Sequence, residues 1–97
     1  MTKEVYIQVQ CFEGFEDNEG KTYDIVVPVP AEWDTDTVEQ EVSEAADEQF
    51  LEFVDEITMD RAEQSLIDTD SPDYERLWEL VYDQCGYQYK VVKTKTV

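Results

Sequence analysis

The spacing of apolar residues changes twice along the chain, and this change limits the possible folds more than any other feature. Residues 3–12 and 21–29 alternate apolar and polar side chains, which predicts two half-buried strands. Residues 87–97 alternate in the same way and predict a third strand. In the long stretch before this strand, apolar residues recur every three or four positions, as they do in amphipathic helices. Two strands alone are marginally stable, so we expect all three to form one sheet.

The segments that join these elements narrow the topology further. The turn-rich residues 13–20 predict a hairpin between the first two strands. Prolines at the end of the second strand indicate that it stops there or lies at an edge of the sheet. In the third strand one face is expected to carry Tyr87, Tyr89 and Val91, and the other is expected to carry Gln88, Lys90, Val92 and Thr94.

Helices are expected between the second and third strands. The first helix begins at a cap formed by Thr35 or Asp36, because such side chains accept hydrogen bonds from free amides at a helix start. Its apolar stripe continues to a short helix or turn over residues 58–67, for which Thr58 or Asp60 is the candidate cap.

Ser71 and Pro72 mark the start of the last helix, since a serine cap followed by proline at the first helical position is a strong initiation signal. This helix is expected to cover residues 72–85 and to stop at Gly86. The prediction is therefore a single α+β domain over residues 1–97. A three-stranded antiparallel or mixed sheet carries two to three acidic helices on one face, in the order ββα(α)αβ.

Charge is distributed unevenly along the chain. Residues 32–83 carry a formal charge of −17 out of −18 for the whole protein, although they include Arg61 and Arg76. The other residues are nearly neutral and include five lysines. An acidic protein repels nucleic acid and anionic membranes, so the expected partner is basic. No apolar run approaches about 18 residues and no signal-peptide pattern is present, which predicts a cytoplasmic protein without membrane contact.

Many acids in this middle region fall at helical spacing away from the apolar stripes, and positions three or four apart share one helix face. The first acidic row comprises Glu41, Glu44, Glu48, Glu52 and Asp55, and the second acidic set comprises Asp70, Asp73, Glu75, Glu79 and Asp83. At about 1.5 Å per residue the first row spans roughly 21 Å. Its spacing of roughly one charge per 4 Å is close to the spacing of about 3.4 Å between phosphates along one DNA strand. These ten carboxylates are the predicted partner-binding residues.

No catalytic or cofactor site is expected. The chain lacks histidine, the commonest general base, and its serines stand outside nucleophile motifs. Cys11 and Cys85 are expected to stay reduced in a cytoplasmic protein. Asp68, Asp70 and Glu79 have the spacing of the first, third and twelfth positions of a calcium loop, but the glycine required at its sixth position is absent. We therefore expect no metal site, no cofactor and no enzymatic activity, with weak calcium binding by these three acids left open.

Three functions are compatible with this sequence. A DNA mimic would occupy a nucleic-acid site on another protein, and a dedicated acidic partner, chaperone or antitoxin would bind one basic protein. A salt-adapted domain would spread its acids over the whole surface, whereas the expected strands are nearly neutral. Candidate aromatic anchors of an interface, with completion of the core as the alternative, are Tyr6, Phe15, Trp33 and Tyr82.

Small size, an intensely acidic middle region and an expected α+β body make the chain resemble small phage and mobile-element inhibitors of host defence. The resemblance is to DNA-mimicking anti-CRISPR proteins that act on type I surveillance complexes, and also to anti-restriction mimics. It covers the whole chain in this general sense, without a shared catalytic motif. It implies action in the host bacterial cytoplasm on a target that holds incoming duplex DNA with lysine and arginine.

Overall fold

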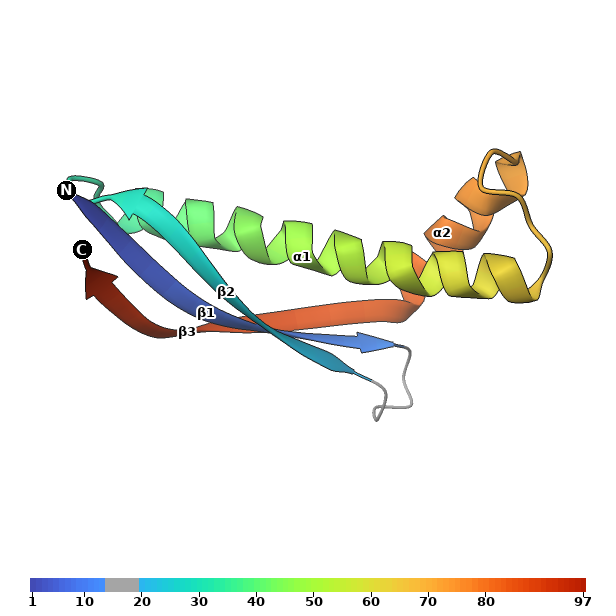
Figure 1. The fold of residues 1–97 in the computed structure, drawn as a ribbon, viewed down its shortest axis with the longest axis horizontal. Helices are drawn as coiled ribbons and strands as arrows, with labels where there is room; N and C mark the ends of the chain where they lie inside the picture. The colour runs from blue at the N-terminus through green and yellow to red at the C-terminus, as the bar shows by residue number, and fades with distance from the viewer. Residues whose placement is uncertain (14–19) are drawn as a thin grey trace.

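The three alternating segments form one antiparallel sheet in the computed structural model, which describes residues 1–13 and 20–97. The strands are β1 (Thr2–Glu13), β2 (Lys21–Pro30) and β3 (Cys85–Thr96), in the order β2-β1-β3 (Figure 1). The predicted α+β fold, with a sheet built from an N-terminal hairpin and a C-terminal strand, is confirmed. Most of the predicted turn at 13–20 lies outside the described residues, as does the candidate anchor Phe15.

A β-bulge interrupts the pairing of β1 with β3. Ile7 pairs with Val91 and Tyr6 pairs with Lys93, so Val92 is an extra residue on β3. Alternation of side chains along β3 therefore changes phase at Val92.

Beyond the bulge, Lys93 and Lys95 lie on the same face of the sheet as Lys90, because they pair with alternate residues of β1. Thr94 pairs with Val5 and turns to the opposite face. The prediction that Thr94 shares a face with Lys90 is wrong, since strict alternation does not allow for an extra residue.

The helical stretch after β2 forms a single helix, α1 (Thr35–Gln64), of 30 residues. The cap is Asp34, whose Oδ1 accepts a hydrogen bond from the Thr37 backbone N–H at 2.8 Å. Hydrogen bonds from Thr37 also hold the pKa of Asp34 below its ordinary value. The predicted caps Thr35 and Asp36 both lie within the helix.

The predicted boundary at residue 58 is wrong, because Thr58 is buried in the middle of α1 and does not cap a new helix. Its hydroxyl donates to the Val54 carbonyl oxygen at 2.7 Å. This bond to the preceding turn satisfies a side chain that would otherwise favour a helix start. No glycine or proline interrupts residues 35–64, so nothing in the backbone breaks the helix.

The C-terminus of α1 is a Schellman motif closed by Leu66. The Ile67 N–H donates to the Ala62 carbonyl at 2.9 Å, and the Leu66 N–H donates to the Glu63 carbonyl at 3.3 Å. Leu66 has a φ of 57°, the left-handed conformation that glycine usually supplies at this position.

The second helix, α2 (Pro72–Gln84), begins where the sequence predicts. The Asp73 N–H donates to Ser71 Oγ at 3.1 Å, and Pro72 occupies the first turn. The predicted stop at Gly86 is wrong, because Cys85 is already extended and Gly86 pairs with Phe12 inside β3. Ladder hydrogen bonds to β1 thus continue directly from the end of the helix.

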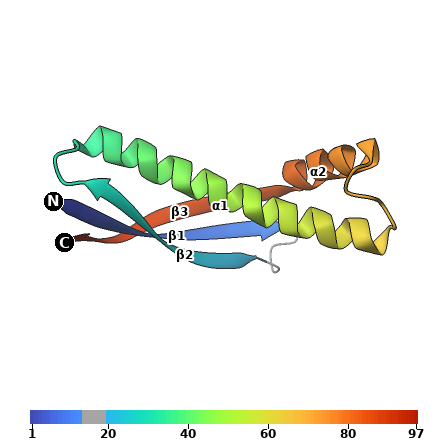
Figure 2. The same ribbon diagram turned by 45° about the horizontal axis from the view of Figure 1, so that its top comes forward.

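The two helices pack on one face of the sheet. α1 crosses the whole face, and α2 returns beside its C-terminal half (Figures 1 and 2). The largest fully buried side chains come from both the sheet and the helices, namely Ile7, Val9, Val29, Val54, Val81, Thr58 and Cys11. The molecule measures 49 × 29 × 19 Å, so α1, at about 1.5 Å per residue, spans most of its length. No helix in the described part of the chain is long and apolar enough to cross a membrane.

Candidate functional site

The first acidic row forms on the outer side of α1, as predicted. Its members follow each other at three- and four-residue steps within one continuous helix. Glu44, Glu48, Glu52 and Asp55 are exposed, and Glu41 is half-buried. The opposite side of α1 carries the apolar residues that face the sheet, including Val42 and Phe50. The fold therefore presents the row to solvent along a straight line.

Few groups neutralise this row. Within the described residues, the side chains of Glu41, Glu44, Glu48 and Glu52 make no hydrogen bond or ion pair. Asp55 is the exception, because its Oδ1 accepts a hydrogen bond from Nε1 of Trp78 at 2.6 Å. Asp55 thus has a structural role between α1 and α2 that its place in the row did not predict.

The second acidic set divides into two parts. Asp70 lies in the connection before α2, and Asp73 lies in the first turn of that helix, where it pairs with Arg76 at 3.8 Å. Glu75, Glu79 and Asp83 follow at four-residue steps on the exposed side of α2. These three form a second row, while Asp70 and Asp73 lie at the start of α2.

The two rows lie side by side over only part of their length. Phe50 and Tyr82 have ring centroids 5.5 Å apart, and Asp55 bonds Trp78, so α2 runs in the opposite direction to α1. The α2 row therefore accompanies the end of the first row near Asp55, and Glu41 extends beyond it. The rows are neighbours in this shared portion near Asp55, but Figures 1 and 2 show α2 inclined to α1, so the rows do not form two parallel lines of charge.

Three basic side chains in the described residues pair with acids outside the first acidic row, and one of them is Arg76, which pairs with Asp73. Lys21 of β2 pairs with Glu56 at 3.2 Å, and Arg61 of α1 pairs with Glu13 of β1. The lysines of β3 lie on the sheet face opposite α1. The sheet thus separates an acidic helical layer from a face that carries lysines.

Trp78 of α2 is a candidate functional residue that was not among the predicted site residues. It is half-buried and lines a hollow of about 270 Å³ together with Tyr74, Glu75 and Glu79. Its ring stacks on Tyr82 with a centroid distance of 5.2 Å. The signal in the sequence is the pair Tyr74 and Trp78, two aromatic residues four positions apart that are each followed directly by a glutamate.

The other candidate anchors have different environments. Trp33 and Tyr82 are exposed by 36% and 39%. Tyr6 is half-buried on the face of the sheet opposite α1, where the Lys93 Nζ lies 4.7 Å from its ring centroid. Trp33 and Tyr82 are therefore the predicted anchors on or beside the helical layer.

The structure does not gather a metal site from the described residues. No group of three or more His, Cys, Asp or Glu side chains is close enough to hold an ion, and this includes Asp68, Asp70 and Glu79. Cys11 and Cys85 are not joined by a disulfide bond. Burial of Cys11, together with its neighbour Cys85, raises the pKa of its thiol to about 11. A thiol with such a pKa is protonated at neutral pH and is a poor nucleophile.

Comparison of the chain with protein-family models, curated proteins and solved structures finds no match.

Proposed function

We propose that this protein is a DNA mimic that inhibits a host defence nucleoprotein by occupying its duplex-DNA site. The proposed target is a type I CRISPR surveillance complex in the bacterial cytoplasm. The observation that carries the proposal is the exposed, largely unpaired first acidic row on a continuous helix, with the lysines of β3 on the other side of the sheet.

The unpaired carboxylates favour a ligand role over a purely solvated surface. Adjacent like charges on a helix destabilise it by roughly 0.2–0.5 kcal/mol per pair. Lys21 lies beside α1 and Arg61 belongs to it, yet they pair with Glu56 and Glu13, which lie outside the row. A groove built to hold DNA would accept the row and gain the same counterion release that phosphates provide.

The shared portion of the two acidic rows supports a double-stranded rather than a single-stranded imitation. Near Asp55, charges on α1 and α2 lie on neighbouring antiparallel helices joined by Trp78. This portion is the proposed centre of the interface. Tyr82, exposed and stacked on Trp78, is its proposed aromatic anchor.

The test is a competition between this protein and labelled duplex DNA for a purified type I complex. The variant reverses Glu44, Glu48 and Glu52 to Lys, since all three are exposed and free of side-chain partners among the described residues. The matched control reverses three exposed acids outside both acidic groups and therefore has the same net charge: Asp24, Glu32 and Asp68.

We expect the row variant to lose competition and the control to retain it. The slope of log K for binding to the complex against log[salt] should also decrease in magnitude by about three, because three phosphate-like contacts are removed. Equal loss in both variants would indicate a general charge effect and refute a defined site. Circular dichroism of all variants checks that the fold is retained.

The alternative functions give different results in the same experiments. Capture of a basic protein without nucleic-acid function would indicate a dedicated acidic partner, chaperone or antitoxin. Absence of any competition, together with folding only in molar KCl, would indicate a salt-adapted domain.

A further inference from the structure

The outer edge of β3 is open. Because β1 pairs with both other strands, β2 and β3 each present one edge without a strand partner among the described residues. On β2, Pro28 and Pro30 lack backbone N–H groups and hinder further pairing. β3 contains no proline, and residues 88–97 are exposed. Its backbone therefore offers donors and acceptors to an added strand.

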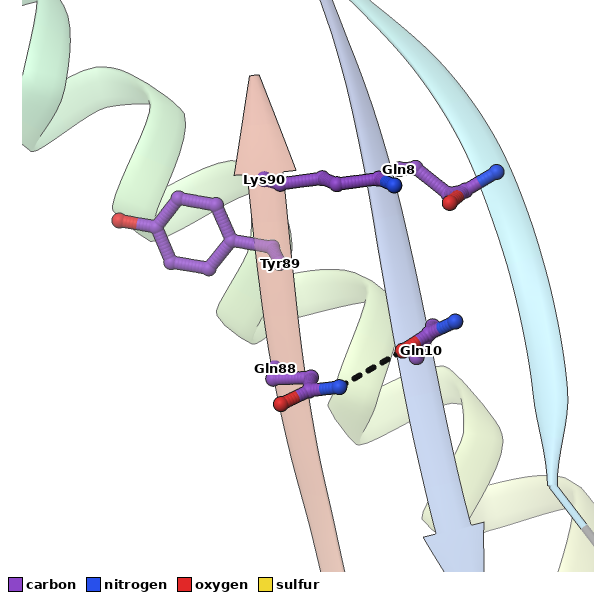
Figure 3. Close-up of a pocket in the computed structure, with 5 residues that line it drawn as sticks. All are labelled: Gln8, Gln10, Gln88, Tyr89 and Lys90. Carbon is purple, nitrogen blue, oxygen red and sulfur yellow. Dashed lines mark hydrogen bonds between the residues drawn. The ribbon is translucent and has the colours of Figure 1, made fainter. Parts of the chain in front are cut away.

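A groove lies between the first half of α1 and the inner side of β3. Its volume is about 430 Å³, and its apolar lining includes Val38, Val42, Tyr89 and Val91. Tyr89 and Val91 are 39% and 53% exposed although they face the helical side of the sheet. Figure 3 shows the Tyr89 ring on the side of β3 away from β1. The helix thus leaves the inner side of β3 partly uncovered at Tyr89 and Val91.

The outer side of β3 is positively charged. The bulge at Val92 brings Lys90, Lys93 and Lys95 to one face, and no acid lies within β3. Figure 3 shows the Lys90 side chain extending from β3 to Gln8 of β1 on this face. Exposed charges are screened over about 8 Å at physiological salt. A strand added at this edge therefore interacts with these lysines more strongly than with the first acidic row, while Glu39 of α1 lines the groove on the other face of the added strand.

We propose that the open edge of β3 binds an extended segment of a partner protein as a fourth strand, and that this segment alternates apolar and acidic residues. Its apolar side chains enter the groove beside Tyr89 and Val91. Its acidic side chains lie opposite the lysines of β3, because residues paired across strands share a face. Main-chain hydrogen bonds supply affinity, and the alternating side chains supply specificity, as in other cases of strand addition. This inference does not rest on the acidic rows.

A second copy of this chain fits the edge poorly. Pairing β3 with itself sets a strand of three lysines beside an identical strand, and like charges opposite each other destabilise a sheet. Charge complementarity therefore selects a different polypeptide with acidic residues at alternate positions.

The test measures binding of a labelled peptide that alternates valine and glutamate and has the length of residues 85–91, the part of β3 before the bulge. Fluorescence anisotropy gives its affinity, and backbone amide shifts of the isotope-labelled protein locate it. Control peptides replace glutamate by lysine or scramble the alternation. The protein variant is Lys90→Glu, which lies within the stretch that the peptide covers, and its matched control is Lys3→Glu.

We expect amide shifts along β3 and around the groove, and a loss of affinity of about tenfold or more in the β3 variant only. Equal binding of the lysine peptide, shifts confined to other elements, or no binding of the valine–glutamate peptide would overturn the proposal. Concentration-dependent dimerisation with shifts in β3 would replace the proposed partner by a second copy. Reversal of the first acidic row should leave peptide binding intact, so this test is separate from the test of DNA mimicry.

Discussion

Replacing Leu66 by glycine should stabilise the protein, although it removes a large apolar side chain. Leu66 closes the Schellman motif of α1 with a φ of 57°. In this conformation the β-carbon of an L-residue crowds its own backbone, which is unfavourable by about 1–2 kcal/mol. Glycine has no β-carbon and adopts the conformation freely.

The magnitude follows from two opposing effects. Leu66 is 94% exposed, so truncating its side chain removes almost no packing. Glycine makes the unfolded chain more flexible, which opposes the gain by roughly 0.5–1 kcal/mol. The free energy of unfolding should therefore rise by about 0.5–1 kcal/mol, which corresponds to roughly 2–8 °C in Tm for a domain of this size.

The assay is thermal and urea unfolding followed by circular dichroism, with Leu66→Ala as the control. Alanine removes the same exposed side chain beyond the β-carbon but keeps the crowded conformation. Its stability should thus stay within about 0.5 kcal/mol of the wild type. If alanine stabilises as much as glycine, or if glycine destabilises, the backbone explanation is refuted.

Three further outcomes are expected. The buried Tyr23 hydroxyl has no hydrogen-bond partner among the described residues, so Tyr23→Phe should leave the free energy of unfolding unchanged or raise it by up to about 1 kcal/mol; a clear loss in urea unfolding would contradict this. Because the folded Cys11 thiol retains its proton to a higher pH than the unfolded thiol, the free energy of unfolding should fall as pH rises from about 9 to 11. A free energy of unfolding that stays constant over this interval would contradict the raised pKa of Cys11. Salt should stabilise the protein, since screening four adjacent pairs in the first acidic row relieves roughly 1–2 kcal/mol between 10 mM and 1 M NaCl; the triple row reversal should reduce this response.

Local patterns predicted most of the secondary structure because the relevant forces act over a few residues. The alternation in β1 and β2 and the cap at Ser71 depend on near neighbours, and both appear in the structure. Thr58 misled the prediction because the same hydroxyl either caps a helix or bonds to the preceding turn. Burial against the rest of the core decides between these two states, and that burial is not visible locally.

The candidate site was predicted only in part, because some of its features depend on local periodicity and others on packing between elements. The first acidic row depends on helical periodicity alone, so it forms on α1 as expected. The roles of Asp55 and Trp78 depend on how α2 packs against α1, which the periodicity of each helix leaves undetermined. The lysines of β3 share a face only because of the bulge at Val92, and a bulge has no fixed sequence signal in this strand.

The central position of β1 determines the order in which the sheet assembles during folding. β2 follows β1 closely in sequence, whereas the pairing of β1 with β3 joins residues at opposite ends of the chain, such as Lys3 and Thr96. Closing so long a loop reduces chain entropy before any contact compensates for it, and such topologies fold slowly. We therefore expect the hairpin and α1 to assemble first and β3 to dock last. Until β3 docks, one edge of β1 stays available to other chains, so the lifetime of that intermediate governs the tendency to aggregate.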